Sequence, residues 1–172
     1  MKLSECEPEL KFPKCIVGID PGKSGGVAFI SSGGLEVHDM PETFEDLRDL
    51  LIGFKKRFGH VVGVLENVHT YRTDRLKAGM EFAIEKMIRN SETCKNALNS
   101  AGITYVQVEP RKWQGDLRLS KKGETKTQRK NRAKDYAKSM YPTVKINLPV
   151  ADSVCIAIYG FKTLKNYLEK NK

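Results

Sequence analysis

The chain has 172 residues, of which 40% are hydrophobic and 30% charged, a composition typical of one soluble globular domain. Its longest apolar runs, near residues 61–65 and 154–158, are far shorter than the ~20 residues that cross a membrane. The first dozen residues contain three glutamates and no apolar segment typical of a secretory signal. We therefore expect a cytoplasmic protein, in the host cytoplasm if the gene is viral, with an N-terminal arm (1–13) and a single domain (14–172).

The four cysteines form no CxxC pair and have no histidines at zinc-site spacing, so a zinc site is not expected. In a reducing compartment they are free thiols, and Cys15 and Cys155 are predicted to be small core residues.

The net charge of +9 is concentrated in one segment. Residues 111–138 contain eleven Lys or Arg and three acidic residues, a local excess of +8. A solvated helix face would account for such a run, but its length, its glycines and its single tryptophan, Trp113, favour contact with a nucleic acid.

The first half of the chain reads as three short strands, a helix and a buried strand. The strands are predicted at residues 15–19, 27–30 and 35–40, separated by glycine-rich turns. A helix follows, with Thr43 as its cap and Gly59 at its end. The continuous apolar run 61–65 is typical of a strand buried on both faces.

The second half alternates helices with one further strand. A helix is predicted over residues 74–100, with a possible break near residues 90–91 and an apolar stripe of Leu76, Met80, Ala83, Ile84, Met87 and Ile88. A strand at 103–108, the basic segment, a helix at 125–140 and a last helix from about 150 to 170 complete the order. This order predicts an α/β fold, a mixed sheet with helices on its faces.

Three carboxylates occupy similar places in this scheme. Asp20 ends the first strand, Glu66 ends the buried strand, and Asp152 lies in the first turn of the last helix. Carboxylates gathered at one sheet edge repel one another unless a cation neutralises them, and hard oxygen ligands suit Mg²⁺. Each residue alone has an ordinary structural explanation, but the combination predicts a metal-dependent phosphodiester hydrolase.

The motifs Ile16–Gly22 (IVGIDPG) with Gly25 and Gly26, Leu65–Val68 (LENV) and Ala151–Ser153 (ADS) resemble the RuvC family of Holliday junction resolvases. The stretch Pro110–Gln114 (PRKWQ) and the Lys/Thr-rich basic segment are similar to those of its phage-type members. The resemblance spans about residues 15–160. It implies an RNase H-like five-stranded mixed sheet with helices on both faces, and a homodimer that nicks two strands of a four-way junction symmetrically.

The resemblance also implies roles for particular residues. Asp20, Glu66 and Asp152 would be catalytic ligands of Mg²⁺, for which Mn²⁺ substitutes. The bacterial enzymes have a fourth acid or a histidine at the position of Pro149, which puts a second metal site in doubt. Lys126 matches a catalytic lysine of the family, with Lys130 as the alternative to it.

Further residues are predicted to contact DNA. Tyr71 is expected to stack on an unpaired base, while the role of His69 stays open between base contact, general base and plain loop residue. The other expected contacts are basic: Arg72, Arg75, Lys77, Arg111, Lys112, Lys121, Lys122 and Lys130. Trp113 is expected to be a core residue.

Three other functions fit parts of the sequence. The Gly18–Gly22 motif also resembles the phosphate-1 loop of the actin and sugar-kinase superfamily, but 172 residues cannot hold the second domain of those proteins. A non-catalytic module that binds branched DNA, and a flap or RNA nuclease of the same fold, stay open. For a dimer interface, the helix over 74–100 is the expected element.

Overall fold

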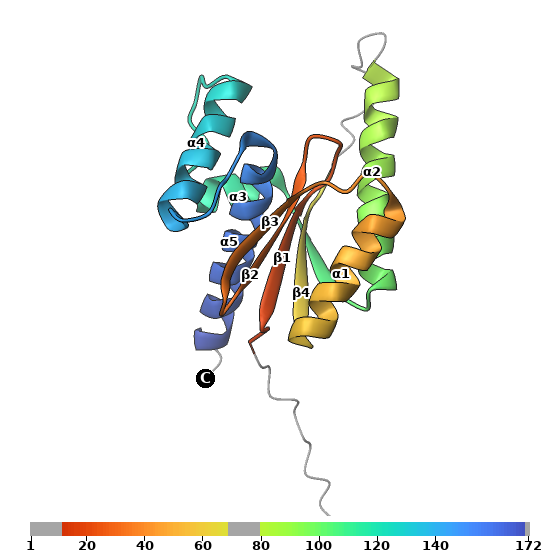
Figure 1. Ribbon diagram of the computed structural model, residues 1–172. Helices are drawn as coiled ribbons and strands as arrows, with labels where there is room; N and C mark the ends of the chain where they lie inside the picture. The colour runs from red at the N-terminus through yellow and green to blue at the C-terminus, as the bar shows by residue number, and fades with distance from the viewer. Residues whose placement is uncertain (1–11, 69–79, 171–172) are drawn as a thin grey trace, which may run out of the picture.

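The computed structural model describes residues 12–68 and 80–170 (Figure 1). The elements in chain order are β1 (Cys15–Asp20), β2 (Gly26–Ser31), β3 (Gly34–Asp39), α1 (Phe44–Phe58), β4 (Val61–Glu66), α2 (Met80–Ser100), β5 (Thr104–Val108), α3 (Pro110–Asp116), α4 (Lys126–Met140) and α5 (Leu148–Lys170). Most of the expected N-terminal arm lies outside the described residues.

The five strands form one mixed sheet in the order β3-β2-β1-β4-β5. The pairs β1–β2 and β2–β3 are antiparallel, and the pairs β1–β4 and β4–β5 are parallel. Helices α1 and α2 cover one face and α3, α4 and α5 the other (Figure 1). The predicted mixed five-stranded α/β sheet with helices on both faces is confirmed.

The two faces of β1 are both buried, as its apolar sequence predicts. Val17 and Ile19 pack with α1 and α2, whereas Ile16 packs with α5. The predicted core positions of Cys15 and Cys155 are confirmed, and both carry free thiols. Because successive side chains of a strand point to opposite faces, one short strand fixes both helical layers.

Helix α5 lies directly on the sheet because Gly18 of β1 and Gly160 of α5 place no side chain between the two elements. A Cβ atom at Gly18 would lie 2.4 Å from the backbone nitrogen of Ala157 and 2.4 Å from the carbonyl oxygen of Ser153. At the other end of the contact, a Cβ at Gly160 would lie 2.4 Å from Val64 Cγ2. This close approach brings the first turns of α5 to the C-terminal end of β1.

The predicted helix cap on α1 is confirmed. Thr43 Oγ1 accepts a hydrogen bond from the backbone N–H of Asp46 at 3.1 Å, and Gly59 ends α1 with a φ of 73°. Helix α5 begins two residues earlier than predicted, because Asn147 Oδ1 accepts from the N–H of Val150 at 3.1 Å. None of the helices in residues 12–68 and 80–170 combines the length and apolarity needed to cross a bilayer.

The described residues of the predicted apolar stripe of α2 are largely exposed and do not belong to the core. Met87 and Ile88 are 50% and 39% exposed, and the buried residues Ser91, Cys94 and Leu98 lie further along the helix. A 21-residue helix is ~31 Å long, whereas strands of six residues span ~20 Å, so the N-terminal half of α2 extends past the sheet (Figure 1). The helix is continuous through residues 90–91, and Leu76 lies outside the described part of the chain.

Helix α3 was not predicted from the sequence. It begins at Pro110, directly after β5, with the proline in the first turn, where its missing N–H has no helical partner to lose. The seven residues of α3 are too few to show a helical period. The sequence of this segment therefore indicates only a basic stretch and not a helix.

Candidate metal and nucleic-acid site

Asp20 and Glu66 end neighbouring parallel strands. The register pairs Ile19 with Leu65, so the next residue of each strand, a carboxylate in both cases, reaches the same edge of the sheet. Asp152, in the first turns of α5, is 5% exposed and approaches from the helical layer above. The structure thus gathers the three predicted carboxylates at one end of the sheet.

The surroundings of Asp20 and Glu66 disfavour their negative charges. Burial, with the nearby charges of Glu66 and Asp152, raises the pKa of Asp20 to about 8, against a smaller opposing effect of Lys130 and Arg129. Burial also raises the pKa of Glu66 to about 6, although a hydrogen bond from Trp113 opposes that rise. Without a bound cation, this end of the sheet therefore favours the protonated form of Asp20.

Arg129, which sequence reasoning missed, forms an ion pair with Asp152. Nη1 lies 3.4 Å from Oδ1 and Nη2 lies 3.4 Å from Oδ2, and the side chains are 19% and 7% exposed. A signal for it was present, because Arg129 lies four and eight residues before Ala133 and Ala137, the buried residues of α4. The small residues mark the packed face of α4, and Arg129 continues that face towards the site.

Trp113 is fully buried, as predicted, but it also has a polar contact that the sequence did not indicate. Its indole N–H donates to Glu66 Oε2 at 2.8 Å across the 47 residues that separate them in the chain. Helix α3 places the ring there, since it begins after Val108, the residue of β5 that pairs with Glu66.

The donor set fits a divalent cation in its chemistry. All three acids offer hard carboxylate oxygens, and a cation would relieve the charge that raises the pKa of Asp20. Within the described ranges, no three Asp, Glu, His or Cys side chains are already drawn together around one point. Asp152 faces Arg129 instead, so binding an ion with all three acids requires this pair to rearrange.

Pro149 is the residue at which the resemblance would lead one to expect a fourth acid. It lines a cavity of about 850 Å³ together with the turn at Gly22–Gly25, the start of α1 and the middle of α2. A proline side chain offers no ligand atom to a metal, so this position adds nothing to the donor set.

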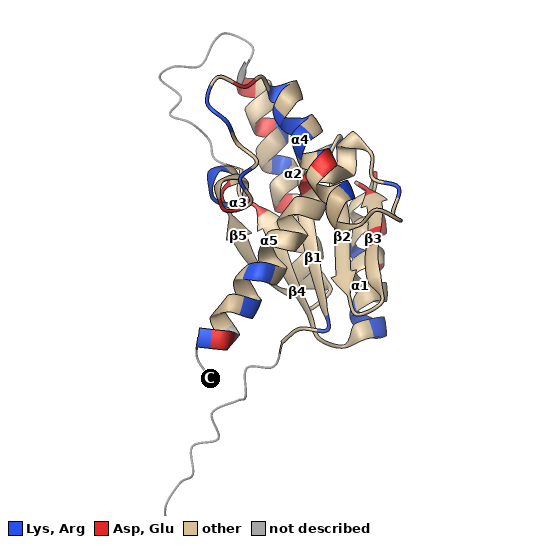
Figure 2. Ribbon diagram, turned by 90° about the vertical axis from the view of Figure 1, so that its left-hand side faces the viewer, with Lys and Arg blue, Asp and Glu red and all other residues tan. Residues whose placement is uncertain are grey.

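The basic residues lie around the same end of the sheet, on α3, on α4 and on the loop between them (Figure 2). Arg111 and Lys112 are exposed on α3, and Lys121 and Lys122 are exposed on the loop. On α4, Lys126 is exposed in the first turn, whereas Lys130 is half-buried and acts on the pKa values of Asp20 and Glu66. His69, Tyr71, Arg72, Arg75 and Lys77 lie outside the described residues.

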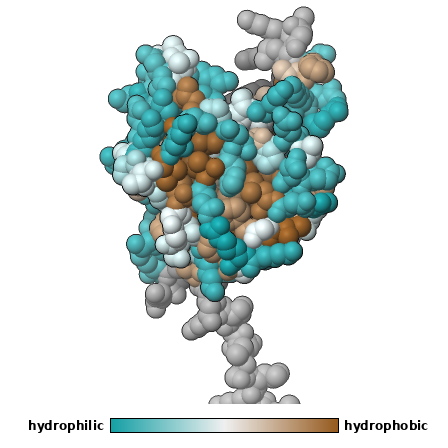
Figure 3. Space-filling model, viewed as in Figure 1, coloured by the Kyte–Doolittle hydropathy of each residue, from teal (hydrophilic) through white to brown (hydrophobic). Residues whose placement is uncertain are grey.

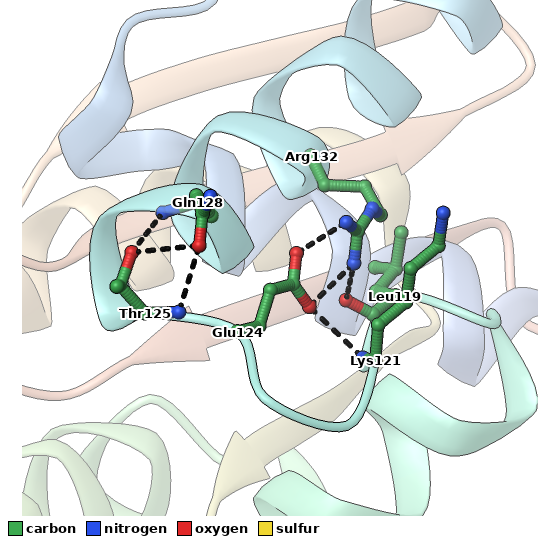
Figure 4. A network of polar contacts seen from close by, with 6 residues as sticks. All are labelled: Leu119, Lys121, Glu124, Thr125, Gln128 and Arg132. Carbon is green, nitrogen blue, oxygen red and sulfur yellow. Dashed lines mark hydrogen bonds and ion pairs between the residues drawn. The ribbon is translucent and has the colours of Figure 1, made fainter.

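A polar network holds the loop before α4 (Figure 4). Arg132 pairs with Glu124 and donates to the carbonyl of Leu119 at 3.2 Å, while Glu124 Oε2 accepts from the N–H of Lys121 at 2.9 Å. Thr125 and Gln128 form a capping box at the start of α4. The network fixes the backbone from which the exposed Lys121 side chain projects.

No protein-family model and no curated protein matches the chain in sequence. Among solved structures, Thermus thermophilus RuvC matches with a TM-score of 0.57 and 15% identity, covering 88% of this chain and 96% of that chain. T. thermophilus RuvC in complex with a Holliday junction substrate matches with a TM-score of 0.58 and 15% identity, covering 89% and 96%. The yeast mitochondrial Holliday junction resolvase Ydc2 matches with a TM-score of 0.47 and 14% identity, covering 95% and 83%.

These similarities show the fold. The chain has the RNase H-like α/β fold of RuvC, in agreement with the fold predicted from its motifs.

Proposed function

We propose that the protein is a Mg²⁺-dependent endonuclease of the RuvC type that resolves Holliday junctions or other branched DNA by symmetric nicking. Its sequence motifs make it most similar to the phage-type members. The observation that carries the proposal is the meeting of Asp20, Glu66 and Asp152 at one edge of an RNase H-like sheet, beside cationic side chains of α4. That combination suits hydrolysis of a phosphodiester.

In this proposal Asp20, Glu66 and Asp152 hold the metal ion, and Mn²⁺ can replace Mg²⁺. When bound, the ion supplies Lewis-acid activation of the scissile phosphate and of the attacking water. The cations of α4 bind and orient the phosphate. Arg129 pairs with Asp152, and the charge of Lys130 lowers the pKa of Asp20. Lys126 lies at the start of the helix, where the family resemblance puts a catalytic lysine.

The DNA is expected to follow the basic surface around this edge. Arg111 and Lys112 on α3, with Lys121 and Lys122 on the loop, are positioned to bind backbone phosphates on one side of the acids. The contacts assigned by resemblance to His69, Tyr71, Arg72, Arg75 and Lys77 remain part of the proposal, outside the described residues. Tyr71 would recognise an unpaired base at the branch point.

A homodimer completes the proposal, because two symmetric nicks require two active sites. The N-terminal half of α2 offers a surface for it. Met87 is 50% exposed and Ile88 39%, and both belong to the apolar stripe that the sequence predicts; hydrophobic side chains are visible at the upper end of α2 in Figure 3. Apolar side chains of this size on an overhanging helix are typical of an interface.

The second candidate is a binding module that recognises branched DNA without cutting it. The ion pair between Arg129 and Asp152 favours it, since a guanidinium already neutralises one of the three acids. The absence of a ligand side chain at Pro149 is in keeping with the same function.

Cleavage of a labelled synthetic four-way junction distinguishes the candidates. The reactions contain Mg²⁺, Mn²⁺ or EDTA, with a linear duplex, a flap and a four-way RNA junction as competing substrates and Asp20→Asn as the inactive control. Paired symmetric nicks in the DNA junction alone, lost with EDTA and in the variant, support the resolvase. Tight binding without cleavage in either metal supports the binding module, and preferred cutting of the flap or RNA retains the nuclease and rejects the resolvase.

A further inference from the structure

Helix α3 has an outer and an inner side with different chemistry. Arg111 and Lys112 are exposed, whereas Trp113, the next residue, is completely buried. Trp113 is the single tryptophan of the chain. The same short helix therefore joins the basic surface to the carboxylate edge.

The inner contact is directional. The indole N–H of Trp113 lies 2.8 Å from Glu66 Oε2, and an indole nitrogen can only donate a hydrogen bond. A phenylalanine would fill most of the same space without this donor. The hydrogen bond therefore does something that packing alone does not, because it fixes the rotation of the Glu66 carboxylate.

The backbone around this contact is also fixed. Val108 pairs with Glu66 across β4 and β5, and the N–H of Asn67 donates to the carbonyl of Val108 at 2.8 Å. Pro110 starts α3 two residues later. Both ends of the Trp113–Glu66 hydrogen bond are thus attached to the same pair of strands.

We propose that Trp113 is a positioning residue for the metal site: by holding Glu66 Oε2, it orients the carboxylate so that Glu66 shares an ion with Asp20. This inference rests on the proposed function, since it assumes that Glu66 is a ligand. Groups that hydrogen-bond to metal ligands set the geometry of those ligands, and their loss commonly weakens metal affinity about 10- to 100-fold. Trp113→Phe, which retains an aromatic ring, should lie near the lower end of that range.

The test measures metal binding directly, on the full chain without DNA. Mn²⁺ is titrated into the wild-type protein, Trp113→Phe and Glu66→Gln, and free Mn²⁺ is followed by electron paramagnetic resonance. In the wild-type protein, emission from Trp113 supplies a second readout, because an ion at Glu66 alters the surroundings of the indole. We expect saturable binding with a matching change in emission, roughly tenfold weaker binding in Trp113→Phe, and no emission change in Glu66→Gln.

Phe54→Leu is the matched control, because Phe54 is a buried aromatic residue on the opposite face of the sheet, stacked on Phe29. It should lower the melting temperature without changing Mn²⁺ affinity. Wild-type affinity in Trp113→Phe, or equal weakening in Phe54→Leu, overturns the positioning role and leaves the proposed nuclease intact. Conversely, Trp113-dependent Mn²⁺ binding in a protein that cuts no junction supports the positioning role and rejects the nuclease. No Mn²⁺ binding by the wild-type protein rejects the metal site and the positioning role together.

Discussion

The two Nη atoms of Arg129 each donate to a different carboxylate oxygen of Asp152, at 3.4 Å in both cases. Asp152 is nearly inaccessible to water, and Arg129 reaches it from the packed face of α4. A guanidinium in this position gives the buried acid a partner when no metal is bound. Metal binding and the Arg129–Asp152 ion pair are therefore expected to compete for the same carboxylate.

This competition is tested by Arg129→Gln. In EDTA the substitution leaves the buried Asp152 without its partner, which should cost about 3 kcal/mol of unfolding free energy. Urea denaturation measures the loss, and Arg129→Gln with Asp152→Asn should recover much of it in a double-mutant cycle. Saturating Mn²⁺ should stabilise Arg129→Gln more than it stabilises the wild type. Equal stability of Arg129→Gln and wild type in EDTA would show that the ion pair contributes nothing.

The raised pKa of Asp20 leads to an expectation about pH. Its folded-state pKa of about 8 is above the usual 3.8, so between these values the folded protein retains a proton that the unfolded chain has released. This contribution to stability is complete below about pH 4 and is lost as pH rises to about 8. Without divalent ions, wild-type stability should therefore fall relative to Asp20→Asn over this range.

Thermal or urea unfolding at pH 5, 6.5 and 8 in EDTA measures this difference. Added Mg²⁺ should reverse it at pH 8, since an ion that binds only the folded state at 100 times its dissociation constant stabilises by about 2.7 kcal/mol. Asp20→Asn should show little of this gain. Parallel pH curves for the two proteins would mean that Asp20 is not the group that titrates.

Gly18→Ala tests the close contact between β1 and α5. The new methyl group would meet the backbone of α5 at 2.4 Å, so the helix must move, at a cost of about 1–3 kcal/mol or more. Because Asp152 moves with α5, Mn²⁺ affinity should fall as well. Gly53→Ala is the control: Gly53 is exposed in α1 with nothing within 4 Å, and alanine there should stabilise the helix by about 0.5–1 kcal/mol.

Two variants of the network at Glu124 and Arg132 test whether DNA affinity depends on the order of the loop or only on its charge. Arg132→Gln removes a positive charge, and Glu124→Gln removes a negative one. If the network orders the loop that carries Lys121 and Lys122, both variants should bind a four-way junction about 2- to 10-fold more weakly, because the loop must then be ordered on binding. Fluorescence anisotropy in EDTA measures the affinity. Tighter binding by Glu124→Gln would mean that charge alone governs the contact.

Met87→Asp tests the proposed dimer. A carboxylate in the centre of an apolar interface is costly to bury, so the variant should be monomeric at micromolar concentrations at which the wild type is dimeric. Sedimentation measures the mass. Glu81→Gln, at an exposed position on α2, should leave the dimer unchanged. A wild-type protein that is already monomeric would reject this interface.

Much of the fold was contained in local patterns. The apolar strands, the cap at Thr43 and the stop at Gly59 depend on a few neighbouring residues, and the sequence predicted them correctly. The placement of Asp20 and Glu66 at one edge also followed from the sequence, since each residue directly follows an apolar run. Helix α3 was not predicted because seven residues show no period. The exposure of the apolar stripe of α2 could not be predicted either, because the stripe does not reveal how far the sheet extends.

Two contacts at the site were decided only by the tertiary structure. Trp113 was predicted to be buried, but its contact with Glu66 depends on how α3 leaves β5. In the sequence, Arg129 is one of many cations in the basic segment. The packing of α4 on α5 places its side chain against Asp152. Local sequence determines which side chains a strand or helix presents. Which distant partner each of them meets depends on the distances between packed elements, and at this site those distances depend on single contacts such as Gly18 against Ala157.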